Sequence, residues 1–127
     1  MKRNEHEVIS KLITAYEEEA RLYQHVQQAA SEQYAVLMNG RDPVKLAELV
    51  ERQRELADNI GKIESSIEPL RQCWERMRDS LHDSTLRTRA MILDELLEQI
   101  ATRIHYIIEL ERQNSKALLA GRVPECQ

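Results

Sequence analysis

Apolar residues recur along this chain at alternating intervals of three and four, the spacing of one face of an α-helix in a coiled coil. Three segments carry the pattern, at about residues 4–38, 43–80 and 84–120. The pattern therefore predicts three long helices. In the first segment the stripe consists of Ile9, Ile13, Tyr16, Ala20, Tyr23, Gln27, Ala30, Tyr34 and Leu37.

The connections between the segments carry residues that end and begin helices. Gly40 suits the left-handed position after a helix, Asp42 suits the N-cap of the next helix, and Pro43 suits its first turn. The polar stretch from Ser80 to Thr85 predicts a second capping loop. Because both connections are short, helices that follow one another should run antiparallel.

Pro69 lies inside the second segment, where a proline costs ~3 kcal/mol and removes one helical hydrogen bond. The apolar spacing keeps its phase across Pro69, which favours a kink in one helix. The alternative is a helix that restarts there with Ser66 as its cap. The expected fold is all-α, with three long antiparallel helices in an up-down-up, coiled-coil-like bundle and a second helix kinked near Pro69.

Residues 1–122 are expected to form a single elongated helical domain, in which Gly121 closes the third helix, and residues 123–127 a flexible tail. In the expected register, stripe positions of the first and second helices meet where their numbers add to 83. Those of the second and third helices meet where they add to 167. Trp74 then closes one end of the bundle against Ile9 and Leu93.

Glu111 and Asn114 interrupt the apolar stripe of the third helix. The register places Asn114 opposite Gln53, with Gln27 one layer away. Gln27, Gln53, Glu111 and Asn114 therefore predict a polar layer near the first connection. One interpretation is that Gln53 and Asn114 pair to fix the register, at some cost in stability. The other is that the layer loosens the end of the third helix for binding.

The third helix also carries apolar residues outside its stripe. A helix packed against its neighbours needs an apolar face ~100° wide, and these extra residues widen it. A face wider than the core requires suggests a partner, whereas a three-helix core or a homodimer would explain it equally. The extra residues are Met91, Ile92, Leu96, Ile108, Leu110 and Leu119.

Composition and charge exclude several classes of function. The net charge of −4 over 127 residues excludes the basic surface of a nucleic-acid-binding protein. No apolar run approaches the ~20 residues of a membrane span, and the first residues do not resemble a signal peptide, so a cytoplasmic protein without membrane insertion is expected. Glu17, Glu18 and Glu19 are expected to form a solvated face.

Residues that carry chemistry are scattered. The four histidines lack the spacing of metal ligands, and Cys73 and Cys126 have no partner at zinc-binding spacing. His82, Asp83 and Ser84 are neighbours in a loop and cannot form a catalytic relay. The expectation is a protein that is not an enzyme and has no catalytic, metal or cofactor site.

The stretch LMNGRDPVKLAELVERQRELADNI resembles flagellar type III export chaperones of the FlgN type, and LLEQIATRIHYIIELERQNSKALLAGR is similar to the last helix of that family. The resemblance covers most of the chain. It implies a cytosolic chaperone that binds hook-associated (hook–filament junction) proteins before export and keeps them unassembled. The implied client-binding residues are in the third helix: Ile100, Ile104, Ile107, Ile108, Asn114, Leu118 and Leu119.

Two other functions are compatible with the residues themselves. One is a structural or adaptor module, such as a spectrin-like three-helix repeat. The other is an inhibitor of a regulatory protein. A monomer and a homodimer are both compatible with the sequence.

Overall fold

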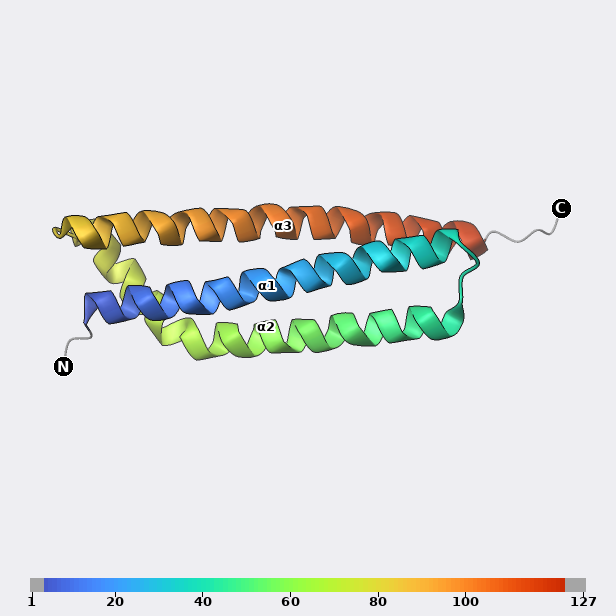
Figure 1. Cartoon of the computed structure of the whole chain (residues 1–127), viewed down its shortest axis with the longest axis horizontal. Coiled ribbons are helices and arrows are strands. Elements are labelled where there is room, and N and C mark those ends of the chain that lie inside the picture. The colour runs from blue at the N-terminus through green and yellow to red at the C-terminus, as the bar shows by residue number, and fades with distance from the viewer. Residues whose placement is uncertain (1–3, 123–127) are drawn as a thin grey trace.

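The computed structural model describes residues 4–122, which form three long helices and one short turn of 3-10 helix. The helices are α1 (Glu5–Met38), α2 (Pro43–Met77), η1 (Arg78–Ser80) and α3 (Ser84–Arg122). They run up, down and up, with α1 between the other two (Figure 1). The predicted all-α bundle of three antiparallel helices is confirmed. The expected tail at 123–127 lies outside the described residues.

Two helix ends differ from the expectation. The second helix was expected to reach residue 80, but α2 ends at Met77 and η1 takes the last three residues. The third helix continues through Gly121 to Arg122. The N-cap of α3 is Asp83, whose carboxylate accepts a 2.8 Å hydrogen bond from the backbone N–H of Thr85.

The connection between α1 and α2 has the predicted capping geometry. Gly40 has a φ of 96°, and the backbone N–H of Arg41 donates to the Val36 carbonyl at 2.9 Å, which closes α1 with a Schellman motif. Asp42 is the N-cap of α2, and its carboxylate accepts hydrogen bonds from the backbone N–H groups of the two residues after Pro43. Gly40 and Asp42 therefore set where α1 ends and α2 begins.

The expected register places α2 between α1 and α3, whereas the structure places α1 between the other two helices. Within residues 4–122, α1 packs along both α2 and α3, while α2 and α3 make almost no close backbone approach to each other. The expected layer-by-layer packing of α2 on α3 is therefore wrong. The reason is a second buried stripe on α1, which gives this helix two packing faces. Its members are Val8, Leu12, Glu19, Leu22 and Ala29.

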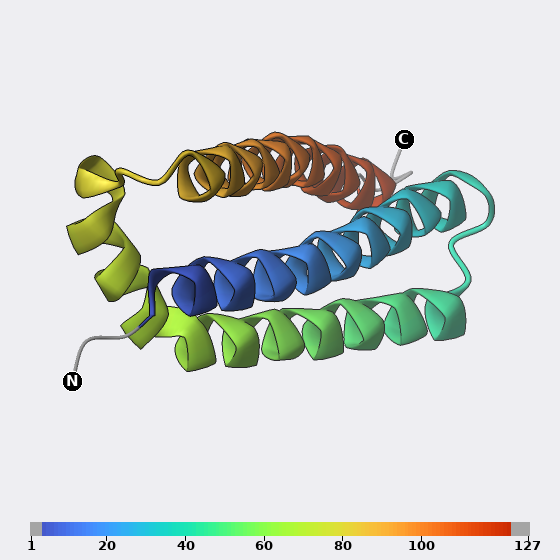
Figure 2. The ribbon, with the colours of Figure 1, turned by 60° about the vertical axis from the view of Figure 1, so that its left-hand side comes forward.

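α2 continues through Pro69 without a break, so the kink is confirmed and a restart at Ser66 is excluded. Figure 2 shows the last part of α2 leaving the line of the rest of the helix and crossing toward the start of α3. This bend carries Leu70 and Trp74 into contact with the other two helices. The bend also closes the bundle at this end and leaves α2 and α3 apart toward the other end.

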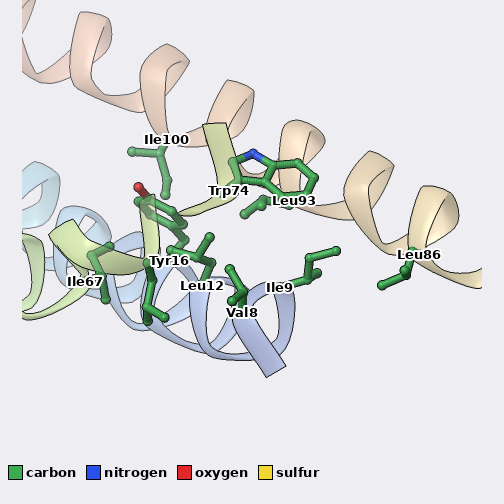
Figure 3. Packing of buried hydrophobic residues seen from close by; sticks show 10 residues of the cluster. Val8, Ile9, Leu12, Tyr16, Ile67, Trp74, Leu86, Leu93 and Ile100 are labelled. Carbon is green, nitrogen blue, oxygen red and sulfur yellow. The ribbon is translucent and has the colours of Figure 1, made fainter. Parts of the chain in front are cut away.

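The closed end holds the main hydrophobic core. Trp74 stands beside Leu93, and Tyr16 lies below Ile100, as Figure 3 shows. Ile9, Trp74 and Leu93 belong to one buried cluster, which confirms that Trp74 closes this end of the bundle. The cluster consists of Val8, Ile9, Leu12, Tyr16, Ile67, Leu70, Trp74, Leu86, Leu93 and Ile100.

Candidate functional site

Between the α1–α2 connection and the kink, α2 and α3 lie apart on opposite sides of α1. They leave a groove whose floor is α1. This central groove encloses about 400 Å³ and is lined mostly by apolar side chains from all three helices. Sites for protein or small-molecule partners are commonly concave and apolar in this way. The lining residues are Tyr23 and Val26 on α1, Gln53, Ala57, Ile60 and Gly61 on α2, and Ile104, Ile107, Ile108 and Glu111 on α3.

Small residues on the α2 side help to keep the groove open. A Cβ added to Gly61 would meet no atom within 4 Å, and the neighbouring Ala57 is exposed. A larger pair of residues at these positions would fill the space between α2 and α3. Gly61 lowers the helix propensity of α2 by about 1 kcal/mol relative to alanine, so the opening has an energetic cost.

A second apolar hollow lies closer to the α1–α2 connection. It encloses about 340 Å³ between α2 and α3, and its lining includes Leu37, Leu46, Val50 and Leu118. The central groove and this hollow both lie where α3 faces α2 across α1. The separation of α2 and α3 therefore exposes apolar surface over much of the open part of the bundle.

The client-binding residues expected on α3 fall into three groups. Ile104, Ile107 and Ile108 line the central groove, and Ile108 is 45% exposed. Leu118 lines the second hollow, while Leu119 points away from it with 60% of its surface exposed.

The remaining two residues line neither hollow. Ile100 belongs to the closed hydrophobic cluster, and Asn114 is only 4% exposed. Ile107 is also buried, although it lines the central groove. Of the seven expected residues, the middle of α3 is therefore the part that faces an open apolar groove.

The expected pairing of Gln53 with Asn114 is wrong. The Asn114 carboxamide donates to the backbone carbonyl of Ala30 at 3.0 Å, and the Gln53 carboxamide donates to the Gln33 side chain at 2.9 Å. Each residue thus bonds to α1, because α1 is the shared neighbour of α2 and α3. Asn114 does reach the layer of Ala30, as the register predicts.

The other two members of the polar layer have different surroundings. The Gln27 side chain accepts a 2.6 Å hydrogen bond from the guanidinium of Arg103, which ties α1 to α3. Glu111 is exposed at the edge of the central groove. The four residues thus form separate contacts to α1 and to solvent rather than one connected layer.

The expectation that Glu17, Glu18 and Glu19 form a solvated face is wrong for Glu19. Glu17 and Glu18 are exposed, but Glu19 is 2% exposed and its carboxyl group meets that of Glu64 on α2. These are two residues whose numbers add to 83, as the register of α1 and α2 predicts. We call Glu19 and Glu64 the acidic pair.

Burial raises the pKa of Glu19 to about 8, and the negative charge of Glu64 and a hydrogen bond with it act in the same direction. Two adjacent carboxyl groups in such a site cannot both ionise easily, so the pair holds a proton at neutral pH. One oxygen of each residue, Oε2, is buried and receives no hydrogen bond from a residue outside the pair.

Two tyrosines flank the acidic pair. Burial raises the pKa of Tyr16 to about 12, with the charge of Glu64 as the next cause. Burial also raises the pKa of Tyr23, with contributions from Glu19 and then Glu64. Because Tyr23 also lines the central groove, the acidic pair lies next to one end of that groove.

Sequence reasoning missed the acidic pair because it followed only one stripe of α1. The signal was present as a second apolar stripe, at Val8, Leu12, Ala15, Leu22, Val26 and Ala29, with Glu19 in phase between them. A glutamate that falls on such a stripe, with apolar members on both sides, is buried if that face of the helix packs against another helix.

Within residues 4–122 there is no cluster of three or more His, Cys, Asp and Glu side chains that could hold a metal ion. Cys73 is a free thiol, and Cys126 lies outside the described residues. In the same part of the chain no helix combines the length and apolar character that crossing a membrane requires.

Comparison of the chain with known protein families, with curated proteins and with solved structures found no match.

Proposed function

We propose that this protein is a cytoplasmic export chaperone that binds hook-associated proteins of the flagellum and keeps them unassembled before type III secretion. The resemblance of its helices to export chaperones of the FlgN type suggests the client. The observation that carries the proposal is the central groove, an apolar surface formed by three helices that residues 4–122 leave uncovered.

The groove suits a helix from a client. Recognition of an amphipathic helix needs an elongated apolar groove that receives residues spaced by three and four. Here α2 and α3 run along opposite sides of α1 and supply the elongated shape (Figure 1), and Ile104, Ile107 and Ile108 supply one apolar wall. A client helix that would otherwise pack on other subunits can bury its apolar face here.

The test is binding of purified hook-associated proteins from the same organism, measured by titration calorimetry. Ile108→Asp places a charge in the groove wall and should weaken binding by at least about tenfold, because a carboxylate would have to be desolvated. Met91→Asp is the matched control: Met91 is 70% exposed on the same helix but does not line the groove. It should bind as the wild type does.

Circular dichroism should show that both variants keep their helices. If folded Ile108→Asp protein binds hook-associated proteins as tightly as wild type, the groove is not the site. If wild-type protein binds none of them, the chaperone function itself is wrong, and a structural or adaptor role is the better account.

A further inference from the structure

In the described part of the chain, the acidic pair brings two buried carboxyl groups together without a donor from any other residue. Oε2 of Glu19 and Oε2 of Glu64 are both buried, and no N–H or O–H group of a residue outside the pair donates to either. Most buried polar atoms in proteins are paired, so these oxygens depend on the proton that the pair holds or on a cation that replaces it. Burying a carboxylate without a cation is also costly, which is why buried charges are normally paired.

Among residues 4–122 no positively charged side chain forms an ion pair with Glu19 or Glu64, although the charge of Arg71 acts on Glu19 from a distance. Arg71 is the nearest positive charge on α2, and its guanidinium is 2.9 Å from Glu68 in an ion pair that is partly exposed. On α3, Arg103 donates to Gln27. Within residues 4–122 no ion pair involves Glu19 or Glu64, so the pair retains its proton in place of a cation.

The position of the pair connects it to the central groove. Glu19 precedes Tyr23 by one turn of α1, and Glu64 follows Ile60 and Gly61 by one turn of α2. The pair therefore lies one helical turn beyond the lining residues at this end of the groove, toward the kinked part of α2 that closes the bundle, and neither glutamate lines the groove itself. A helix that fills the groove would bring its last residues beside these two carboxyl groups.

We propose that the groove binds an amphipathic helix that carries a lysine or arginine at the end of its apolar face, and that this cation binds between Glu19 and Glu64. The inference rests on the proposed function and specifies the chemistry of the client segment. Charge complementarity identifies the occupant: an apolar groove that adjoins two carboxyl groups with buried oxygens and no ion-pair partner within residues 4–122 fits an apolar helix that ends in a cation. Such a contact would be a charge-assisted hydrogen bond in a site shielded from water.

Binding should then release a proton. In the free protein the pair shares a proton, and the incoming cation replaces it, so both carboxyl groups are ionised in the complex. Linkage requires affinity to rise with pH while the free pair is protonated, by at most tenfold per pH unit for one proton. The other titratable and charged groups that interact with the pair or with its flanking tyrosines are Tyr16 and Tyr23 on α1 and Glu68 and Arg71 on α2.

The test uses a phage-displayed library of helical peptides with a fixed stripe of leucines and randomised positions elsewhere. Selection is carried out on the full-length wild type and on Gly61→Trp, in which a large side chain enters the space that Gly61 leaves open. Gly61→Ala is the matched control for the change in helix propensity. Peptides that bind wild type and Gly61→Ala but not Gly61→Trp are groove binders.

Groove binders should carry Lys or Arg at one fixed position at the end of the leucine stripe. Replacing that residue by Gln should weaken binding to wild type by about tenfold or more, as for other desolvated charge pairs. The same replacement should have little effect on binding to Glu64→Gln or to Glu19→Gln/Glu64→Gln protein. Binding of the basic peptide should also strengthen as the pH rises from 6 to 8, and this dependence should vanish in the double variant.

The outcomes separate the two proposals. Groove binders without a preference for Lys or Arg, or with a preference that is undiminished in Glu64→Gln protein or survives in the double variant, would overturn the cation site and leave the groove as a binding site. An absence of groove binders would contradict both the cation site and the proposed function. Circular dichroism of each variant shows whether it is folded, and the single variant Glu64→Gln serves if the double variant is not.

Discussion

The Asn114 side chain on α3 donates a 3.0 Å hydrogen bond to the backbone carbonyl of Ala30 on α1, while its own carbonyl oxygen is buried without a partner. One polar residue thus makes one contact that stabilises the packing of α3 on α1 and leaves one atom that destabilises it. The Ala30 carbonyl lies inside α1, so its helical hydrogen bond remains if Asn114 is replaced.

Replacing Asn114 by leucine should therefore raise the free energy of unfolding, by about 1 kcal/mol. The change removes a hydrogen bond with a net value of about 0.5–1.5 kcal/mol, but it also removes the larger penalty of the unpaired oxygen and adds buried apolar area. Asn114→Asp should instead destabilise by about 2 kcal/mol or more, because a carboxylate would face the Ala30 carbonyl oxygen. Urea denaturation at pH 7 measures both; a destabilised leucine variant would show that the hydrogen bond dominates.

The acidic pair should make stability fall as pH rises. The pKa of Glu19 is about 8 in the folded chain and close to its ordinary value of 4.5 in the unfolded chain. Between these two values the folded state binds the extra proton, so the free energy of unfolding decreases from about pH 5 to about pH 8, by on the order of a few kcal/mol. Above pH 8 the loss is complete.

Glu19→Gln should remove most of this pH dependence, because an amide does not titrate. Denaturation curves of wild type and variant at pH 5, 6.5 and 8 measure the difference, and the variant should gain most over wild type at pH 8. Glu18→Gln is the control, since Glu18 is exposed and pairs with Arg21. A wild-type stability that is constant over this range would mean that the pair does not share a proton.

The closed end should carry far more stability than the end of α3. Leu93 is fully buried beside Trp74, and Leu93→Ala should lower the free energy of unfolding by about 2–5 kcal/mol through lost burial and a cavity. Leu119→Ala, a matched change at a residue that is 60% exposed, should stay within about 0.5 kcal/mol of wild type. The fluorescence of Trp74 follows both unfolding transitions; equal effects would contradict the division into a closed and an open end.

Arg41 joins the α1–α2 connection to the end of α3, because its guanidinium donates to the backbone carbonyl of Ala117. Its own φ is 56°, a left-handed conformation that glycine adopts without strain. Arg41→Gly should therefore keep the turn while releasing α3. Amide hydrogen exchange near Ala117 should become faster than in wild type, whereas Arg112→Ala, which only breaks an ion pair with Glu109 within α3, should leave it unchanged.

Local patterns in the sequence were sufficient for the elements of this fold. The three-and-four spacing of apolar residues predicts three helices, and Gly40, Asp42 and Pro43 predict where the first helix ends and the second begins, because caps and turns depend on neighbouring residues. The constant phase across Pro69 also predicts a kink in an unbroken helix. Each of these follows from interactions within a few residues along the chain.

The candidate site could be predicted only in part. Ile104, Ile107 and Ile108 were expected to bind a partner and do line the groove, but Ile100 and Asn114 were expected there too and line neither the groove nor the second hollow. From the sequence alone, an apolar residue at a core position and one in a groove look the same, since both lie on the same helical face. Only the distance between the packed helices, which the tertiary structure sets, distinguishes a core residue from a groove residue.

The sequence by itself determined the three helices, the capped turn between α1 and α2 and the antiparallel direction of successive helices, because helical period, caps and loop length act locally. The tertiary structure decided that α1, rather than α2, is the shared neighbour, since α1 has two packing faces whose relative burial depends on all three helices. That choice brings Asn114 to Ala30 instead of Gln53, buries Glu19 against Glu64, and leaves α2 and α3 apart with an apolar groove between them.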